Sequence, residues 1–228
     1  MDWTVQQEGG RTVITDISEM QSPHDLGIVA ADKISRLAAD TIDGIGRTAL
    51  AALSSTNDFG ISLGTDNLLD MVAAAQALDF EPVPGAGFYV ILHPYALRGL
   101  TGESGLNGYI DVTAQANAGA LTKGAVGQYR GCTFLPSSKF VADGSGNYPV
   151  YLVPANSIAA GDIGSLQFVN WSAPGPGNEL GQLRGFGFKG ILGAKVLDFS
   201  ESADGTGTNA TSVPRVLKYT VTTGVSGA

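Results

Sequence analysis

The stretch Phe88-Tyr-Val-Ile-Leu-His-Pro94 is the most informative part of this chain. Its unbroken apolar run is typical of a short strand that is covered on both faces. Pro94 favours a helix start, because its missing N–H is one of the donors that a helix start leaves unbonded. We expect this helix to run through Leu100. A later run, residues 132–135, predicts another strand with Cys132 buried in it, so the segment indicates a mixed fold of helices and sheets.

Working outward toward the N-terminus, the clearest helical signal covers residues 23–53. Ser22-Pro23-His24-Asp25 is typical of a capped helix start. Gly44 and Gly46 weaken the helix by about 1 kcal/mol each relative to alanine, and the sequence leaves open whether it is straight. Apolar residues recur at helical spacing through the segment: Leu26, Val29, Ile34, Leu37, Ala38, Ile42, Ile45, Ala49 and Leu53.

The remaining elements are shorter. A second helix is predicted from Thr65, closed by Pro82 and Pro84. Residues 99–108 are expected to form a loop, and residues 200–212 a polar tail. Together with the helices, the later strands predict an α+β fold; they are expected at residues 148–153, 166–171, 190–199 and 213–222.

The N-terminal segment, residues 3–16, predicts a β-hairpin. Residues 3–8 and 11–16 are rich in Trp, Thr, Val and Ile, which favour strands. Gly9-Gly10 between them readily supplies the positive φ values of a tight hairpin turn. Because a lone two-stranded hairpin is marginal in water, we expect it to pack on its own domain or on a neighbouring subunit.

Composition bounds the class of protein. Of 228 residues only 15% are charged, against about 25% in an ordinary soluble domain, so we infer that much of the surface lies against other protein. The net charge is −8 and no cluster of Lys or Arg occurs, which argues against a dedicated nucleic-acid-binding site.

No apolar run approaches the roughly 18 residues of a membrane span, and the N-terminus lacks a secretory signal. A single cysteine excludes an intrachain disulfide and fits a reducing compartment.

Two patterns raise the question of catalysis or cofactor binding. Gly185-Phe-Gly-Phe-Lys-Gly190 matches the dinucleotide fingerprint, but the residues after it read as a strand, whereas the fingerprint needs a helix there. The better interpretation is that these glycines allow the start of a strand to pack closely against its neighbours. The two histidines, His24 and His93, are expected to be solvated and locally hydrogen-bonded, respectively. We therefore predict no catalytic residue, no cofactor and no metal site.

Two further groups are ambiguous from the sequence. Asp40 and Asp43 share a helix face and could serve a hydrolase, but such pairs on the polar side of a helix are usually just solvated. Arg130 lies among glycines and aromatic residues. It could pair or stack across an interface, or it could be an exposed loop residue, and both alternatives stay open.

Four segments carry a resemblance to a known family: residues 88–94, Gly127-Gln-Tyr-Arg-Gly-Cys-Thr-Phe-Leu-Pro-Ser-Ser138, Tyr148-Pro-Val-Tyr-Leu-Val-Pro154 and Gly187-Phe-Lys-Gly190. They resemble the major capsid proteins of tailed bacteriophages, and most closely the N4-type capsid family, which has the Hong Kong 97 fold. The likeness covers residues 10–199 and rests on packing motifs. Family members usually carry a longer N-terminal arm than the residues that precede Trp3 here.

The resemblance implies a division of the chain. Residues 1–20 would form a hairpin like the extended E-loop, and residues 21–64 the spine helix of the peripheral domain. Residues 65–184 would form mainly the axial domain, and residues 185–228 the returning peripheral strands and a C-terminal tail. The implied intersubunit contacts are the hairpin tip, Glu8, Gly9, Gly10 and Arg11, together with Arg130.

The resemblance also implies a function. The chain would be a non-enzymatic structural subunit that self-assembles, through hexamers and pentamers, into an icosahedral shell. The shell would enclose double-stranded DNA without binding it specifically, and portal, scaffold or decoration proteins would be further partners. Such a protein is made in the bacterial host cytoplasm and ends in the virion capsid. The alternatives are an encapsulin-like compartment shell and, less favoured, a secreted β-rich binding module.

Overall fold

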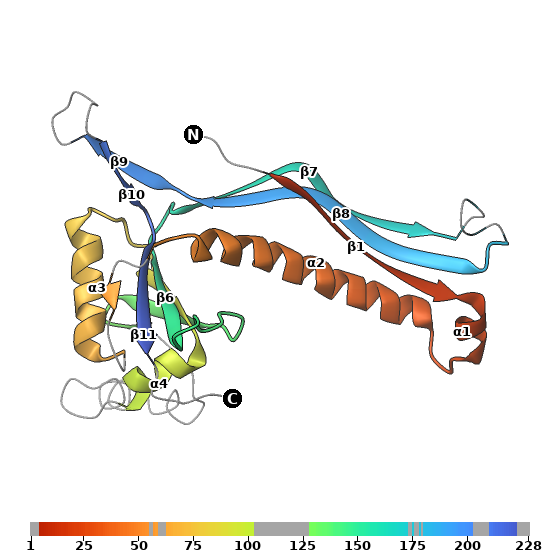
Figure 1. Cartoon of the computed structure of the whole chain (residues 1–228), viewed down its shortest axis with the longest axis horizontal. Helices are drawn as coiled ribbons and strands as arrows, with labels where there is room; N and C mark the ends of the chain where they lie inside the picture. The colour runs from red at the N-terminus through yellow and green to blue at the C-terminus, as the bar shows by residue number, and fades with distance from the viewer. Residues whose placement is uncertain are drawn as a thin grey trace. The chain divides into compact units, whose positions relative to one another are not determined.

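The computed structural model describes residues 5–54, 57–58, 63–102, 128–172, 175, 178, 180–202 and 210–222. The chain divides into a long-helix unit, Met1–Ala51 with Ala159–Lys195, and a six-stranded unit, Ala52–Ile158 with Val196–Ala228 (Figure 1). The helices are α1 (Asp16–Gln21), α2 (Leu26–Ala51), α3 (Thr65–Ala77) and α4 (Pro94–Gly102). The strands are β1 (Gln6–Thr15), β2 (Asn57–Asp58), β3 (Phe88–Leu92), β4 (Gln128–Tyr129), β5 (Cys132–Pro136), β6 (Asn147–Val153), β7 (Ile158–Trp171), β8 (Leu183–Val196), β9 (Asp198–Ser202), β10 (Ala210–Pro214) and β11 (Leu217–Thr222). This mixture confirms the predicted α+β class.

The long-helix unit has two layers. Strands β1, β8 and β7 form a sheet in that order, and α2 runs along one face of it (Figure 1). Ile34 and Ala38 of α2 pack against Phe188 of β8, with Leu166 and Phe186 at the margin of this cluster. A single helix on a narrow sheet offers few positions for burial, so the unit has a thin core.

The prediction of an N-terminal hairpin is wrong. β1 is one continuous strand through Gly9 and Gly10, and it pairs antiparallel with β8 along its whole length, from Gln6 opposite Leu192 to Thr15 opposite Leu183. The long partner β8 lies far away in sequence and offers more hydrogen bonds than a local turn could. A Cβ on Gly10 would lie 2.5 Å from Leu37 Cδ2, so Gly10 permits close packing on the helix rather than a turn.

The long predicted helix is confirmed, with a shifted start. It begins at Leu26 rather than at residue 23, because Asp25 acts as the cap: its Oδ1 accepts from the Gly27 N–H at 2.8 Å. α2 then continues through Gly44 and Gly46 to Ala51. The preceding residues form the short helix α1, where the side chain of Thr15 accepts from the Ser18 N–H.

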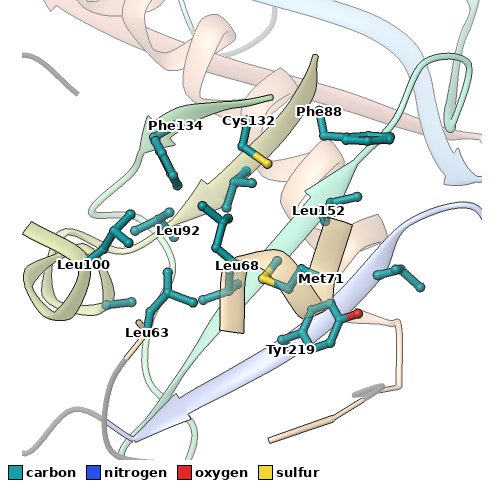
Figure 2. Packing of buried hydrophobic residues seen from close by; sticks show 14 of the residues in the cluster. Leu63, Leu68, Met71, Phe88, Leu92, Leu100, Cys132, Phe134, Leu152 and Tyr219 are labelled. Carbon is teal, nitrogen blue, oxygen red and sulfur yellow. The ribbon is translucent and has the colours of Figure 1, made fainter. Parts of the chain in front are cut away.

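The six-stranded unit contains the main core. Its sheet has the order β2-β11-β6-β3-β5-β4, and β3 lies inside it, parallel to β5 and antiparallel to β6. Phe88, Val90 and Leu92 of β3 are buried, while Tyr89 and Ile91 are half-buried, so one face is more deeply covered than the other. Figure 2 shows α3 and α4 side chains, among them Leu68, Met71 and Leu100, packed on this sheet.

Several predicted bounds change. β7 and β8 are longer than the predicted strands: they are neighbours in the three-stranded sheet, and β8 also pairs with β1 along ten positions. Residues 213–222 belong to two strands, β10 and β11. Part of the predicted tail, at residues 200–202 and 210–212, lies in the β9–β10 ribbon, and residues 99–102 of the predicted loop are helical. The rest of that loop lies outside the described residues.

The unit boundaries also differ from the predicted division. The six-stranded unit takes residues from three of the predicted ranges, since β11 pairs with β6 rather than with the strands beside α2. The long-helix unit takes its two later strands from Ala159–Lys195. Hydrophobic runs located the elements but not their partners, because pairing depends on which edges meet in the folded chain.

Candidate assembly surfaces

The four N-terminal residues predicted to contact a neighbour lie in the middle of β1, not at a tip. Glu8, Gly9, Gly10 and Arg11 pair with Gly190, Lys189, Phe188 and Gly187 of β8. Because successive strand residues point to opposite faces, the four divide into two pairs. Glu8 and Gly10 are half-buried, whereas Gly9 and Arg11 are exposed. Gly9 and Arg11 are thus available to a partner, while Gly10 is packed on α2.

One side of the β1–β8 pair, which we call the open face, contains exposed residues of β1 and the exposed Lys189 of β8, whereas Gly185 and Gly187 of β8 are buried there. It contains Gln7, Gly9, Arg11, Val13 and Thr15 of β1, opposite Ile191, Lys189, Gly187, Gly185 and Leu183 of β8. A shallow groove of about 190 Å³ runs over Gln7, Gly164, Gln167, Lys189, Gly190 and Ile191. The charged residues in these two sets of strand positions are Arg11 and Lys189, and none is acidic.

The long-helix unit also exposes large apolar side chains. On α2, Ile28 is 69% exposed and Ile42 is 47% exposed. On β7, Ile163 is 72% exposed and Phe168 is 57% exposed. β7 is an outer strand of its sheet, and a long apolar edge strand is a favourable place for another chain to pair. These residues are the part of the candidate surface that sequence reasoning missed.

Arg130 lies in the other unit, in the two-residue turn between β4 and β5. Its φ is 48° and that of Gly131 is 77°, while Tyr129 and Cys132 pair across the turn. Positive φ at both central positions is typical of a tight hairpin turn. The exposed position of Arg130 agrees with the loop interpretation, and its role as an intersubunit contact stays a prediction.

His93 has a local structural role. Its Nδ1 accepts from the Tyr95 N–H at 3.1 Å, and its ring stacks on Tyr148 with centroids 4.5 Å apart. Burial lowers the pKa of His93 from its usual value, which favours the neutral ring that this hydrogen bond needs. The expected local hydrogen bond is confirmed, and the exposed position of His24 agrees with solvation.

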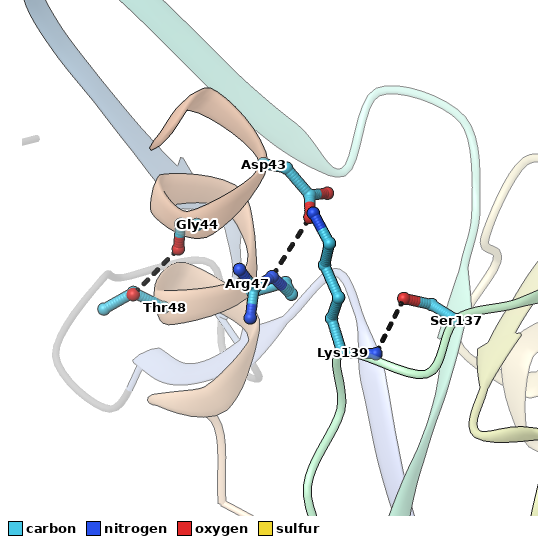
Figure 3. A network of polar contacts seen from close by, with 6 residues as sticks. All are labelled: Asp43, Gly44, Arg47, Thr48, Ser137 and Lys139. Carbon is cyan, nitrogen blue, oxygen red and sulfur yellow. Dashed lines mark hydrogen bonds and ion pairs between the residues drawn. The ribbon is translucent and has the colours of Figure 1, made fainter. Parts of the chain in front are cut away.

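Cys132 lies in the core, and Asp43 of α2 is paired along its own helix. Cys132 is fully buried, and desolvation raises the pKa of its thiol to about 11, so the thiol stays protonated at neutral pH. Asp43 pairs with Arg47 one turn along α2, at 3.1 Å (Figure 3). Within the described part of the chain, no group of three or more His, Cys, Asp or Glu could hold a metal ion.

The glycine pattern at residues 185–190 lies within β8, as the strand interpretation expected. A Cβ on Gly185 would lie 2.0 Å from the ring of Trp171, so this glycine makes room for an indole. Among the described residues, no helix is both long and apolar enough to cross a membrane.

The sequence matches no known protein family and no curated protein. The structure, however, resembles phage capsid structures over nearly its whole length. It matches the head structure of Helicobacter pylori bacteriophage KHP40 with a TM-score of 0.73 and 11% identity, covering 96% of this chain and 76% of that one. It matches the capsid asymmetric unit of cyanophage Pam1 with a TM-score of 0.71 and 14% identity, covering 96% and 74%.

A weaker match, with a TM-score of 0.51 and 11% identity, is to a virus-like particle from Pyrococcus furiosus; it covers 94% of this chain and 76% of that one. At such identities the likeness concerns the fold. It is nevertheless nearly complete for this chain, and it agrees with the fold that the packing motifs implied. The chain has the Hong Kong 97-type fold of phage capsid proteins.

Proposed function

We propose that the chain is a structural subunit that self-assembles into the icosahedral shell around a phage double-stranded DNA genome. The observation that carries this proposal is the fold match, which covers 96% of the chain against phage capsid structures at TM-scores of 0.71 to 0.73. The exposed apolar side chains of α2 and β7 support it, because such side chains are normally covered in an assembly. The subunit acts as a shell component of the virion and not as an enzyme.

The proposed assembly uses the two surfaces described above. The open face and the apolar strand β7 would meet neighbouring subunits, and Arg130 would provide a second contact from the six-stranded unit. In this proposal the long-helix unit corresponds to the peripheral domain and most of the six-stranded unit to the axial domain. Double-stranded DNA would be enclosed without a specific site, consistent with a net charge of −8.

Electron microscopy of the purified chain tests the proposal. We expect closed particles of uniform diameter, with five- and six-fold clusters of subunits. A chain that stays monomeric at every concentration and ionic strength would contradict a shell function. Any portal, scaffold or decoration protein would be recognised as an additional band in particles purified from the bacterial host.

A compartment shell that encloses protein is the second candidate, and it is kept because one matched structure is a virus-like particle attributed to Pyrococcus furiosus rather than to a phage. The phage capsid structures match at higher TM-scores, so the genome shell is the preferred function. The contents of purified particles decide between the two. Nuclease-protected DNA of uniform length supports the genome shell, whereas a co-purifying enzyme inside nucleic-acid-free particles supports the compartment.

A further inference from the structure

His93 binds the first turn of α4 in two ways. Pro94 has no N–H, and the next amide, that of Tyr95, donates to the ring atom Nδ1 of His93 at 3.1 Å. The carbonyl oxygen of His93 accepts from the N–H groups of Ala96 at 2.9 Å and Leu97 at 3.2 Å. Of these three hydrogen bonds, only the one to the ring depends on the protonation state of a side chain.

The same ring forms one side of a small aromatic cluster. It stacks on Tyr148 of β6, with centroids 4.5 Å apart and ring planes inclined by 23°, and it meets Tyr95 edge-on at 4.9 Å. The two tyrosine rings lie 5.8 Å apart. Because Tyr148 is half-buried and packs against the main core, the His93 ring covers a residue at the margin of that core.

Protonation of the ring is incompatible with this arrangement. Nδ1 can accept a hydrogen bond only in the neutral ring, with its hydrogen on Nε2, because a protonated imidazole is a donor at both nitrogens. In the protonated ring, the hydrogen on Nδ1 would face the Tyr95 N–H. Its charge would also lie at the positive end of the α4 dipole. The face of Tyr148 attracts a cation, but a ring that stayed in the stack would still leave two donors opposed.

The titratable groups in contact with the ring are Tyr95 and Tyr148. On the adjoining described segments the charged residues are Arg98 of α4, Lys139 after β5 and Asp143 before β6. Arg98 and Lys139 are exposed, and the carboxylate of Asp143 accepts from backbone N–H groups of its own turn. Burial lowers the pKa of His93, so the ring is neutral at neutral pH and gains its proton under acidic conditions.

We propose that the His93 ring is a pH-sensitive switch where β3, α4 and β6 meet. The neutral ring binds the Tyr95 amide and covers Tyr148, whereas the protonated ring leaves both and turns toward solvent. The carbonyl bonds to Ala96 and Leu97 keep α4 in place. Acidification would therefore uncover an aromatic surface on the six-stranded unit without unfolding it. This inference goes beyond the proposed shell function and does not depend on it.

Nuclear magnetic resonance of unassembled full-length subunits, from neutral to mildly acidic pH, tests the switch. The chain has two histidines, His24 and His93, so each ring gives its own titration. We expect neutral His93 to have its hydrogen on Nε2, and the Tyr95 amide and Tyr148 ring signals to shift with the midpoint of the His93 ring. At the acidic end, hydrogen exchange at Tyr95 relative to Leu97 should have risen at least about fivefold, which corresponds to the usual contribution of a cap.

Two matched variants identify the group responsible. The side chain of Asn can accept from the Tyr95 amide at every pH, so His93→Asn should abolish the shift of that amide. His24→Asn, at an exposed position, should leave the shift unchanged. The Ala96 amide, bound to the His93 carbonyl, should not follow the titration in any of these chains.

Three results overturn the switch. A Tyr95 amide or a Tyr148 ring that does not follow the His93 titration would show that the protonated ring stays in place. Equal changes at Ala96 would show that the helix start unfolds as a whole. A shift that persists in His93→Asn would come from another group. Each of these results leaves the shell function standing, and a wild-type chain that never assembles leaves the switch standing.

Discussion

The two units of this chain differ in how much of their apolar surface they bury themselves. Among the described residues, eighteen buried residues form one core in the six-stranded unit, whereas three form the cluster between α2 and β8. The exposed large apolar residues show the reverse: the long-helix unit has eleven of them and the six-stranded unit has four. One unit is therefore held mainly by its own core, and the other leaves apolar surface that only a neighbour can cover.

For the proposed assembly, this difference predicts that the long-helix unit contributes most of the association energy. Burial of apolar surface stabilises by about 25 cal/mol per Å², whether the covering surface belongs to the same chain or to another. The six-stranded unit has gained that stabilisation within the subunit. In the proposed shell, the long-helix unit, with one helix on three strands, would gain part of it only on association. The following changes test this division.

The largest loss of subunit stability is expected from a truncation in the six-stranded unit. Leu152→Ala removes a fully buried side chain of β6 and should lower the free energy of unfolding by about 2–5 kcal/mol. Ile163→Ala, on the 72% exposed side chain in β7, should change it by no more than about 0.5 kcal/mol. Urea unfolding of unassembled subunits measures both. Equal losses would mean that β7 is covered within the subunit.

A backbone contact in the six-stranded unit gives the next effect. Gly87 has φ 71°, and a Cβ there would lie 1.9 Å from the carbonyl oxygen of Gly131, which accepts from the Phe88 N–H. Gly87→Ala should cost about 3 kcal/mol through clash and strain. Gly85→Ala is the control, because its φ is 80° but nothing lies within 4 Å; it should cost about 1 kcal/mol. Similar losses at both positions would show that strain alone matters.

The exposed strand β7 should affect assembly without affecting the fold. Ile163→Ser with Phe168→Ser removes apolar side chains that are 72% and 57% exposed. If a neighbour covers them, each loses about 1.5 kcal/mol or more of association energy, so assembly should need at least about tenfold more protein. Val141→Ser, at an 80% exposed residue of the six-stranded unit, is the control. Sedimentation velocity measures the assembled fraction, and unchanged assembly of the β7 variant would exclude this strand as an interface.

Much of the element order could be predicted from the sequence, because helical and strand periodicities are local. The long helix, the apolar strand β3 and the His93 cap of α4 all follow from short stretches of residues. Gly9-Gly10 misled the prediction, because two glycines between β-rich runs look the same whether they form a turn or permit close packing on α2. The pairing of β1 with β8 joins residues that are far apart in the sequence, from Gln6 opposite Leu192 to Thr15 opposite Leu183, and no local pattern reports it.

The candidate surfaces were only partly predictable for the same reason. Arg11 and Gly9 were named as contacts, but the division of β1 into a packed and an open face needs the register with β8. Ile163 and Phe168 look like ordinary core residues in the sequence, since hydrophobicity does not say whether the covering surface comes from the same chain. Arg130 was ambiguous because its positive φ is a property of the turn and not of the residue type.

The His93 cap makes the stability of the six-stranded unit depend on pH. Burial lowers the pKa of His93 in the folded chain below its usual value of 6.5. At a pH between the folded and the unfolded pKa, His93 therefore binds a proton more readily in the unfolded chain. The contribution of His93 is therefore complete above pH 6.5 and is lost as the pH falls through the folded pKa. The loss should be about 1 kcal/mol, the usual contribution of a cap. Asn at this position can cap at every pH, so His93→Asn should remove the dependence.

Unfolding measured on the wild type and on His93→Asn, from neutral to mildly acidic pH, gives the difference directly. The groups that the structure places against the His93 ring are Tyr95 on α4 and Tyr148 on β6. Two charged groups lie on the same elements or beside them. Arg98, further along α4, is exposed, and the carboxylate of Asp143, before β6, accepts from the N–H groups of Ser145 and Asn147. The titration of Asp143 is common to both chains. His24→Asn, at an exposed position, is the control. Parallel curves for the wild type and His93→Asn would contradict the role of the cap.

The smallest effect, and the only stabilising one, is expected in the long-helix unit. Gly46 lies within α2, and a Cβ there would meet nothing within 4 Å, so Gly46→Ala should raise the free energy of unfolding by about 0.5–1 kcal/mol through helix propensity. Gly10→Ala in the same unit should lower it, because its Cβ would lie 2.5 Å from Leu37 Cδ2. Thermal unfolding of unassembled subunits measures both signs. If Gly46→Ala stabilises the subunit yet blocks assembly, a neighbouring subunit approaches α2 at that glycine. The interface of the long-helix unit would then include α2. If assembly is unchanged, no neighbouring subunit packs tightly against Gly46.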